Sequence, residues 1–400
     1  MKKITFVLFF AFLVSIMAAC GDHSEETSTS NSSSSKDTAI IDVNSVSPSK
    51  SIEDVGGETF KKSFMGNSPV FIRDEILVTF EGGLKAYEWR TGQFLWEYDL
   101  GDSTVKYIPD ASFHSTFLAE DYVFYGKEGE MYRVGIDINP ENNSHEKIEI
   151  PLISRFHVDG STVYAQNRME DDRAKIFSFD ANTLDIHWET ELENVGSLDV
   201  FHVSDNYVII DAGVSFKAVV LNAGTGEILY EEEGKSAYFH GGISIGEDVY
   251  LIRLNAGETG TVFHINPNTG EKTEFDTIEG TDSYSDVTSI YNFEDKILFT
   301  TDQKAYYYNP SEKKIEWIIE NSDETTGTTD YIRLGNYFYT VLRSSDFNYD
   351  YIVKTDITKG EIVDSYTLAG LSDSSMRIFP TNDSSFIGFI RDGYMYYLEE

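Results

Sequence analysis

The chain has 400 residues and a formal net charge of -37 at pH 7, because its 68 Asp and Glu residues outnumber its 31 Lys and Arg residues. Such an acidic surface repels nucleic acid and anionic lipid headgroups, so neither is an expected partner. The single cysteine excludes an intramolecular disulfide, and the aromatic content of 14% favours β-structure.

Residues 1–19 have the pattern of a secretory signal peptide. Lys2 and Lys3 give a positive start, residues 6–16 are apolar, and small residues precede Cys20. The apolar run is too short for a transmembrane helix. The segment resembles a bacterial lipoprotein signal, although Met17 stands where that family more often has leucine. The resemblance implies that Cys20 carries the lipid, and that the protein is held at the extracytoplasmic face of the cell membrane.

Residues 20–55 follow as a stretch rich in Ser and Thr and poor in large apolar residues. A segment of this composition cannot bury enough surface to fold, so we predict a disordered tether behind the lipidated Cys20. A long Ser/Thr tether is similar to those of Gram-positive lipoproteins, which favours a Gram-positive cell.

From residue 56 to residue 400 the chain alternates short strands with turn residues, and one pattern recurs. An acidic or amide residue is followed four residues later by Gly and eight residues later by an aromatic residue. The pattern is complete in Glu88/Gly92/Trp96 and Asn222/Gly226/Tyr230, and one member is missing in Asp180/Trp188, Asn266/Gly270, Asn309/Trp317 and Asp356/Gly360.

The pattern returns about every 40–50 residues, and each unit contains four strands, which is the signature of an all-β propeller. Two further copies, a blurred one near Asp137 and a last one placed by spacing at Glu399, bring the markers to eight. Eight markers predict an eight-bladed propeller of four-stranded antiparallel blades, with seven blades as the alternative. Two packed β-sandwiches are a further alternative. The last unit stops before its fourth strand, and residues 57–66 resemble the missing piece. We therefore predict that residues 57–66 complete the last blade as its outer strand.

The stretch AYEWRTGQFLW, residues 86–96, resembles the repeat of PQQ-like (quinoprotein alcohol dehydrogenase-like) propellers, with Glu88 in place of an Asp. The resemblance implies a Gly in the turn between the third and fourth strands and an aromatic residue docked against the neighbouring blade. The lipid-anchored architecture is also similar to that of the propeller lipoprotein of the outer-membrane β-barrel assembly machinery, a non-catalytic scaffold. The matching positions are Gly92, Gly226, Gly270 and Gly360 for the turn, and Trp96, Trp188, Tyr230 and Trp317 for the aromatic residue.

Cofactor chemistry is not expected, because PQQ-dependent enzymes of that family carry an adjacent Cys pair and this chain has one Cys. No metal site is predicted; the candidates are His157 and His202, which hold equivalent positions on successive first strands, whereas His114 and His240 are three residues out of register. The acidic clusters lack the spacing of a Ca²⁺ loop.

No nucleophile elbow, H-E-x-x-H helix or phosphate-binding Gly loop occurs in the sequence. The sequence therefore predicts a monomeric, non-catalytic propeller that binds an envelope protein, a peptide or a glycan through its channel mouth and loops. The alternative is a lyase or hydrolase with a His/acid pair in the channel, and a third interpretation is a purely structural or sensor module.

Overall fold

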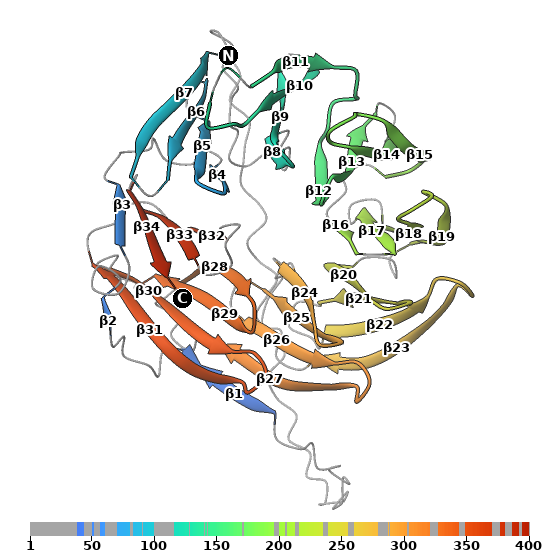
Figure 1. Ribbon diagram of the computed structural model, residues 1–400. Coiled ribbons are helices and arrows are strands. Elements are labelled where there is room, and N and C mark those ends of the chain that lie inside the picture. Colours follow the sequence, from blue (N-terminus) through green and yellow to red (C-terminus); the bar gives the residue numbers. More distant parts are fainter. Residues whose placement is uncertain are drawn as a thin grey trace, which may run out of the picture. The chain divides into compact units, whose positions relative to one another are not determined.

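The computed structural model (Figure 1) leaves residues 1–19, predicted to be a signal peptide, as well as Cys20 and His114, outside the residues that it describes. In the part that it describes, no helix has the length and apolar character needed to cross a membrane. The described residues are 38–43, 50–51, 57–60, 70–80, 83–89, 91–99, 116–127, 129–139, 141, 143–169, 172–195, 200–204, 206–212, 216–234, 239–254, 260–278, 287, 289–301, 304–320, 327–343, 349–369, 377–380, 386–391 and 394–399.

The described strands form eight sheets, and in each sheet consecutive strands are hydrogen-bonded in antiparallel order. We number these sheets as blades 1 to 8 along the chain. The first four are β4 (Val70–Arg73), β5 (Ile76–Phe80), β6 (Gly83–Glu88) and β7 (Gln93–Asp99); β8 (Thr116–Ala119), β9 (Tyr122–Lys127), β10 (Glu130–Gly135) and β11 (His145–Ile148); β12 (Arg155–Asp159), β13 (Thr162–Arg168), β14 (Ala174–Asp180) and β15 (Ile186–Leu192); and β16 (Val200–Val203), β17 (Tyr207–Ala212), β18 (Lys217–Asn222) and β19 (Ile228–Glu233).

Blades 5 to 8 continue the same order, and the eighth has only three strands from the C-terminal part of the chain. They are β20 (Gly241–Ile245), β21 (Asp248–Arg253), β22 (Gly260–Asn266) and β23 (Glu271–Ile278); β24 (Ser289–Phe293), β25 (Lys296–Thr300), β26 (Lys304–Asn309) and β27 (Lys314–Glu320); β28 (Gly327–Leu334), β29 (Tyr337–Arg343), β30 (Tyr349–Asp356) and β31 (Glu361–Ala369); and β32 (Arg377–Pro380), β33 (Phe386–Arg391) and β34 (Tyr394–Glu399).

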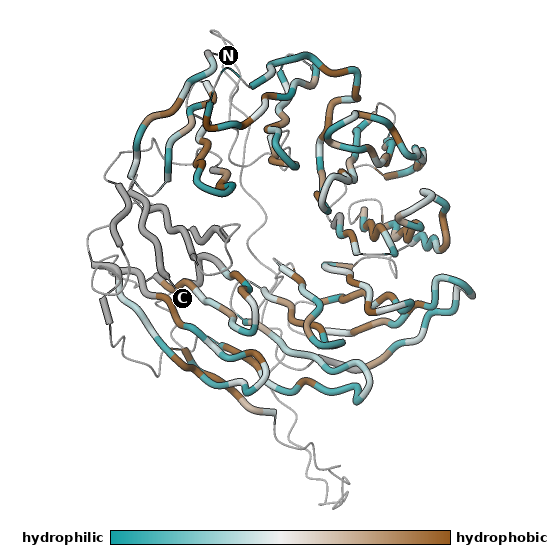
Figure 2. The backbone as a smooth tube through the Cα atoms, viewed as in Figure 1, coloured by the Kyte–Doolittle hydropathy of each residue, from teal (hydrophilic) through white to brown (hydrophobic). Residues whose placement is uncertain are grey.

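The position of a strand within its blade decides its burial. In blade 4, every residue of the second strand, β17, is buried, whereas residues of the fourth strand, β19, are half-buried or exposed. A strand buried on both faces needs a near-continuous apolar sequence, and YVIIDA in β17 supplies one. Figure 2 shows hydrophobic stretches within the strands and hydrophilic residues at many of the turns.

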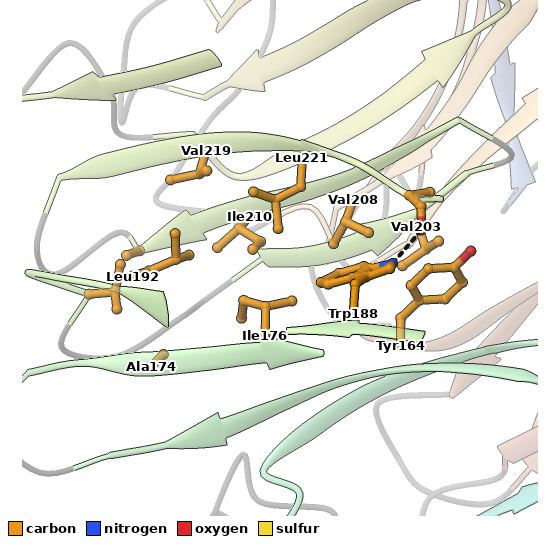
Figure 3. Packing of buried hydrophobic residues seen from close by; sticks show 13 residues of the cluster. Tyr164, Ala174, Ile176, Trp188, Leu192, Val203, Val208, Ile210, Val219 and Leu221 are labelled. Atoms are coloured by element: carbon orange, nitrogen blue, oxygen red, sulfur yellow. Dashed lines mark hydrogen bonds between the residues drawn. The ribbon is translucent and has the colours of Figure 1, made fainter. Parts of the chain in front are cut away.

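Neighbouring blades pack through their faces and through their first strands. The first strands contact one another in the pairs β12/β16, β16/β20, β20/β24 and β28/β32. One hydrophobic cluster joins blades 3 and 4, with Ile176 and Trp188 from one blade and Val208, Ile210 and Leu221 from the other (Figure 3). Four-stranded blades that pack in series with their first strands innermost define a β-propeller, and the eight sheets confirm the predicted fold.

The last blade is completed from the N-terminal part of the chain. β3 (Gly57–Phe60) pairs in antiparallel register with β34, so that Gly57 lies opposite Tyr397 and Glu58 lies opposite Tyr396. This pairing confirms, for residues 57–60, the prediction that an N-terminal segment supplies the outer strand. The closure joins both ends of the repeat array in one sheet and covers an edge that would otherwise be open.

The prediction of a disordered tether over residues 20–55 is wrong for its later part. β1 (Ala39–Asp42) pairs in parallel with β27, and β2 (Lys50–Ser51) pairs in parallel with β31. Val43, directly after β1, is fully buried in a cluster that also contains Trp317 and Ile357. The correction has a physical reason: an edge strand offers free backbone groups to any extended segment, and the short apolar run AIIDV at residues 39–43 can add to it and bury Val43.

Candidate functional site

The recurring Gly residues lie in left-handed turns between the third and fourth strands. Gly226 has φ of 72°, and its N–H donates to the carbonyl of Asn222 at 2.8 Å. The side-chain Oδ1 of Asn222 accepts the N–H groups of Gly224 and Thr225, each at 3.0 Å, so that the first marker residue closes the turn locally. The other three Gly residues have the same conformation, with φ of 69° at Gly92, 70° at Gly270 and 65° at Gly360.

The recurring Trp residues reach the turn of the following blade. Trp188 donates its indole N–H to the carbonyl of Ala223 at 2.8 Å, the bond drawn in Figure 3. Trp317 donates to Ile357 at 2.9 Å and Trp96 donates to Asp137 at 2.8 Å. Tyr230 packs against a cluster that joins blades 4 and 5. The indole N–H groups of these Trp residues are bonded to the protein itself, so the side chains hold neighbouring blades together.

Trp188 and Trp317 also depend on the Gly of the following copy. A Cβ added at Gly226 would lie 2.4 Å from Cε3 of Trp188, and a Cβ added at Gly360 would lie 2.7 Å from Cδ1 of Trp317. At Gly270, which follows the copy that has Tyr230 instead of Trp, an added Cβ would meet no atom within 4 Å. Next to Trp188 and Trp317, Gly therefore supplies space as well as backbone freedom.

The two candidate histidines lie together on adjacent first strands. The ring centroids of His157 on β12 and His202 on β16 are 6.2 Å apart. Burial lowers the pKa of His157, and burial together with the neighbouring His157 lowers the pKa of His202 to about 4, so both rings are neutral at pH 7. Over the described ranges, no group of three or more His, Cys, Asp or Glu side chains is placed to hold a metal ion.

His240 has a different role from His157 and His202. It directly precedes β20. Its backbone N–H donates to the carbonyl of Ile252 at 2.7 Å, and its ring Nδ1 accepts the backbone N–H of Leu254 at 2.9 Å. These bonds fix the start of blade 5, so His240 has a local structural role.

A pocket of about 290 Å³ lies where the first hairpins of blades 4, 5, 6 and 7 meet. Its walls come from β16, β20, β24 and β28 and from the turns that follow them. Among the described residues, no Asp or Glu lines it. The polar groups of its lining belong to His202, Ser204, Asn206, Ser244, Tyr291, Asn292 and Arg333.

Hydrogen bonds between blades hold the wall of this pocket. The hydroxyl of Ser244 donates to the hydroxyl of Ser204 in the preceding blade. The Nδ2 atom of Asn206 donates to the carbonyl of Gly246 at 3.2 Å. Because these bonds cross from one hairpin to the next, the pocket is formed before any ligand enters, as is usual for small-molecule sites.

Arg333 is held in place by backbone oxygens and by an aromatic ring. Its Nη1 donates to the carbonyl of Asn292 at 2.7 Å, and its Nε donates to the carbonyl of Gly335 at 3.2 Å. The guanidinium carbon lies 4.6 Å from the centroid of the Phe293 ring. Burial lowers the pKa of Arg333, but a guanidinium stays charged at pH 7. The pocket therefore presents one fixed positive charge.

Arg333 also departs from the repeat. The strand register places Arg333 opposite Phe338, two residues before the turn of the first hairpin of blade 7. The equivalent position is Asn292 in blade 6, opposite Ile297, and Ser244 in blade 5, opposite Val249. In blades 1 to 4 this place is aliphatic, with Ile72, Leu118, Val158 and Val203.

The turn markers did not predict Ser244, Asn292 and Arg333, because these residues lie on the first strands and not in the recurring turns. The signal was present in the sequence: once the first hairpins are superposed at their two-residue turns, the change from aliphatic to polar residues in blades 5 to 7 is visible. Polar residues at a position that elsewhere packs between blades lose hydrophobic burial, so such a change indicates another use.

Comparison of the sequence with protein-family models and with curated proteins finds no match. Among solved structures, the chain is similar to the computationally designed Ika8 protein, with 15% identity and a TM-score of 0.57 over 86% of this chain and 99% of that one. It is also similar to Sqt1 of Saccharomyces cerevisiae, with 10% identity and a TM-score of 0.56 over 86% and 97%. BamB of Moraxella catarrhalis is found with 12% identity and a TM-score of 0.47 over 86% and 95%. At these identities the likeness concerns the fold alone.

Proposed function

We propose that this chain is a non-catalytic binding propeller, anchored through a lipid on Cys20 at the extracytoplasmic face of the cell membrane. Its partner, an envelope protein, a peptide or a glycan, enters the pocket between the first hairpins of blades 4 to 7. The observation that carries the proposal is the polar lining of this pocket by residues that break the repeat, in a fold whose other recurring residues serve packing.

The chemistry of the described lining favours binding over catalysis. A lyase or hydrolase of the kind considered above would use a His next to a carboxylate, and the described lining contains no Asp or Glu. His202 has His157 as its ring neighbour, and its lowered pKa keeps the ring neutral at pH 7, so it is a poor general acid. The remaining lining groups are hydroxyls, amides and one guanidinium, which recognise ligands through hydrogen bonds.

The lipid anchor is tested by labelling with radioactive palmitate in growing cells. The Cys20→Ala variant should carry no label and should leave the membrane fraction, because two or more acyl chains are what hold such a protein on a bilayer. Equal labelling of the variant and the natural chain would contradict the anchor.

The binding site is tested by photo-crosslinking in intact cells. A photoreactive amino acid at Asn206, an exposed residue of the pocket rim, should yield a discrete crosslinked product. The matched control is Glu233, which is exposed in the same blade at the far end of β19, away from the hairpin turn. Products of equal yield from both positions, or from neither, would count against a partner at the pocket.

A further inference from the structure

We infer that the pocket between blades 4 and 7 binds a carboxylate, with the guanidinium of Arg333 as the group that pairs with it. The inference rests on the proposed function, since it assigns a ligand class to the same site. It is carried by the geometry of Arg333 and by the charge of the surrounding chain.

Several cations of this protein pair with carboxylates, as expected of a chain in which Asp and Glu outnumber Lys and Arg by 68 to 31. Arg133, on β10, pairs with Glu146 at 2.7 Å, and Lys296 pairs with Glu316 at 2.8 Å. Arg333 makes no ion pair with any described residue, although it is half-buried. Its internal partners are two neutral backbone carbonyls and the Phe293 ring, none of which balances its charge, and an anionic ligand would do so.

The guanidinium has donors left for a ligand. Nη1 and Nε are bonded to backbone carbonyls, and the ring of Phe293 lies against the guanidinium carbon. Within the described part of the chain, Nη2 has no hydrogen-bond partner. The fork is therefore fixed in orientation before binding, and its remaining N–H groups suit the planar oxygens of a carboxylate.

The pocket also limits the size and charge of the ligand. Its volume of about 290 Å³ lies at the lower end of the range for small-molecule sites, which fits one amino-acid residue or one sugar ring. One guanidinium balances a single negative charge, whereas a phosphate dianion would enter an acidic protein with one charge unbalanced. The neutral groups nearby, such as the hydroxyls of Ser204 and Ser244 and the amide of Asn292, can bond the rest of a carboxylate-bearing residue.

The test is calorimetric titration of the full-length lipoprotein, solubilised in detergent, with N-acetylalanine, glucuronate and inorganic phosphate, each up to about 10 mM. The first two probes separate a peptide end from an acidic sugar as the source of the carboxylate. We expect at least one of them to bind, and its affinity to fall at least tenfold in the Arg333→Gln variant. The Arg333→Lys variant keeps the positive charge but loses the planar pair of N–H donors. Its affinity should therefore lie between that of the natural chain and that of the Arg333→Gln variant.

The matched control is Arg133→Gln. Arg133 also bridges to backbone carbonyls of a neighbouring blade, those of Ala181 and Asn182 at 2.8 Å, and lies 4.4 Å from the Tyr122 ring, but it does not line the pocket. Its variant should bind as the natural chain does. Melting temperatures of the Arg333→Gln and Arg133→Gln proteins show whether a loss of binding reflects unfolding. The Arg333→Lys variant, which keeps the positive charge, gives a second binding measurement with less disturbance of the fold.

The inference is overturned if neither carboxylate binds, if both bind the Arg333→Gln protein as tightly as the natural chain, or if phosphate binds more tightly than either carboxylate. Its failure is distinct from failure of the proposed function. Crosslinking from Asn206 without carboxylate binding would remove the ligand class and leave a binding propeller. Carboxylate binding without crosslinking would leave the ligand class and remove the macromolecular partner.

Discussion

Replacement of Gly226 by Ala tests whether the contact between a Trp and the next turn holds neighbouring blades together. The residue has φ of 72°, and the new Cβ would lie 2.4 Å from Cε3 and 2.6 Å from Cδ2 of Trp188. The indole is 8% exposed and is fixed by its bond to Ala223, so it cannot withdraw without losing that bond. The left-handed backbone costs Ala about 1–2 kcal/mol, and overpacking costs about 1–3 kcal/mol.

The sum predicts that Gly226→Ala lowers the free energy of unfolding by about 2–5 kcal/mol. Gly270→Ala is the matched control, because its φ is 70° and its added Cβ would meet nothing within 4 Å. It should therefore cost only the backbone part, about 1–2 kcal/mol. The measurement is urea unfolding of the full chain, followed by tryptophan fluorescence and by circular dichroism to check that the transitions coincide. Equal losses in the two variants would refute the steric reasoning.

Three further predictions concern other parts of the fold. Trp96→Ala should lower stability by about 3–5 kcal/mol, because the indole is 4% exposed and bonds the next blade; an unchanged melting curve would remove Trp96 from the core. Val43→Asp should lower the urea midpoint clearly, whereas Ile40→Asp should change stability by less than about 0.5 kcal/mol, because Val43 is fully buried and Ile40 is 62% exposed; equal effects would contradict docking of this segment. His202 has its pKa lowered from 6.5 to about 4, so the unfolded chain takes up the proton first and stability should fall as the pH drops from 6.5 towards 4; a His202→Gln variant should show a flatter melting temperature over that range.

The fold could be predicted from the sequence because each blade repeats its local signals. The turn at Asn222 and Gly226 is formed by residues four apart, and its backbone conformation needs no information from distant segments. Strands of blade 4 could be located to within a few residues, since β17 and β18 are apolar runs between turn residues. The outer strand at residues 57–60 could be predicted because the last unit lacked one strand, and a propeller leaves only one place for it.

The strands β1 and β2 could not be predicted in the same way. They add to β27 and β31 in parallel, and the side-chain signal is limited to the short run AIIDV at residues 39–43, which does not reveal the sheet edge that it joins. The exposed Ile40 and the buried Val43 lie in a segment whose average composition is polar. The composition of a segment indicates whether it can fold by itself. The segment that contains β1 and β2 instead adds to the edges of sheets that the rest of the chain forms.

Repeat architecture separates packing residues from binding residues, and the first hairpins show how. One residue further from the turn than Arg333, successive blades carry Phe71, Phe117, His157, His202, Ile243, Tyr291 and Ile332. That row is aromatic or aliphatic apart from the two histidines, and their rings contact each other as aromatic residues do. His157 and His202 therefore keep the packing character of their row, which weighs against a metal role. Arg333 keeps nothing of the aliphatic character of its own row, and it faces a pocket. Among the described residues of its row, Arg333 is the one that brings a charge to the pocket, and this makes it the residue to mutate first.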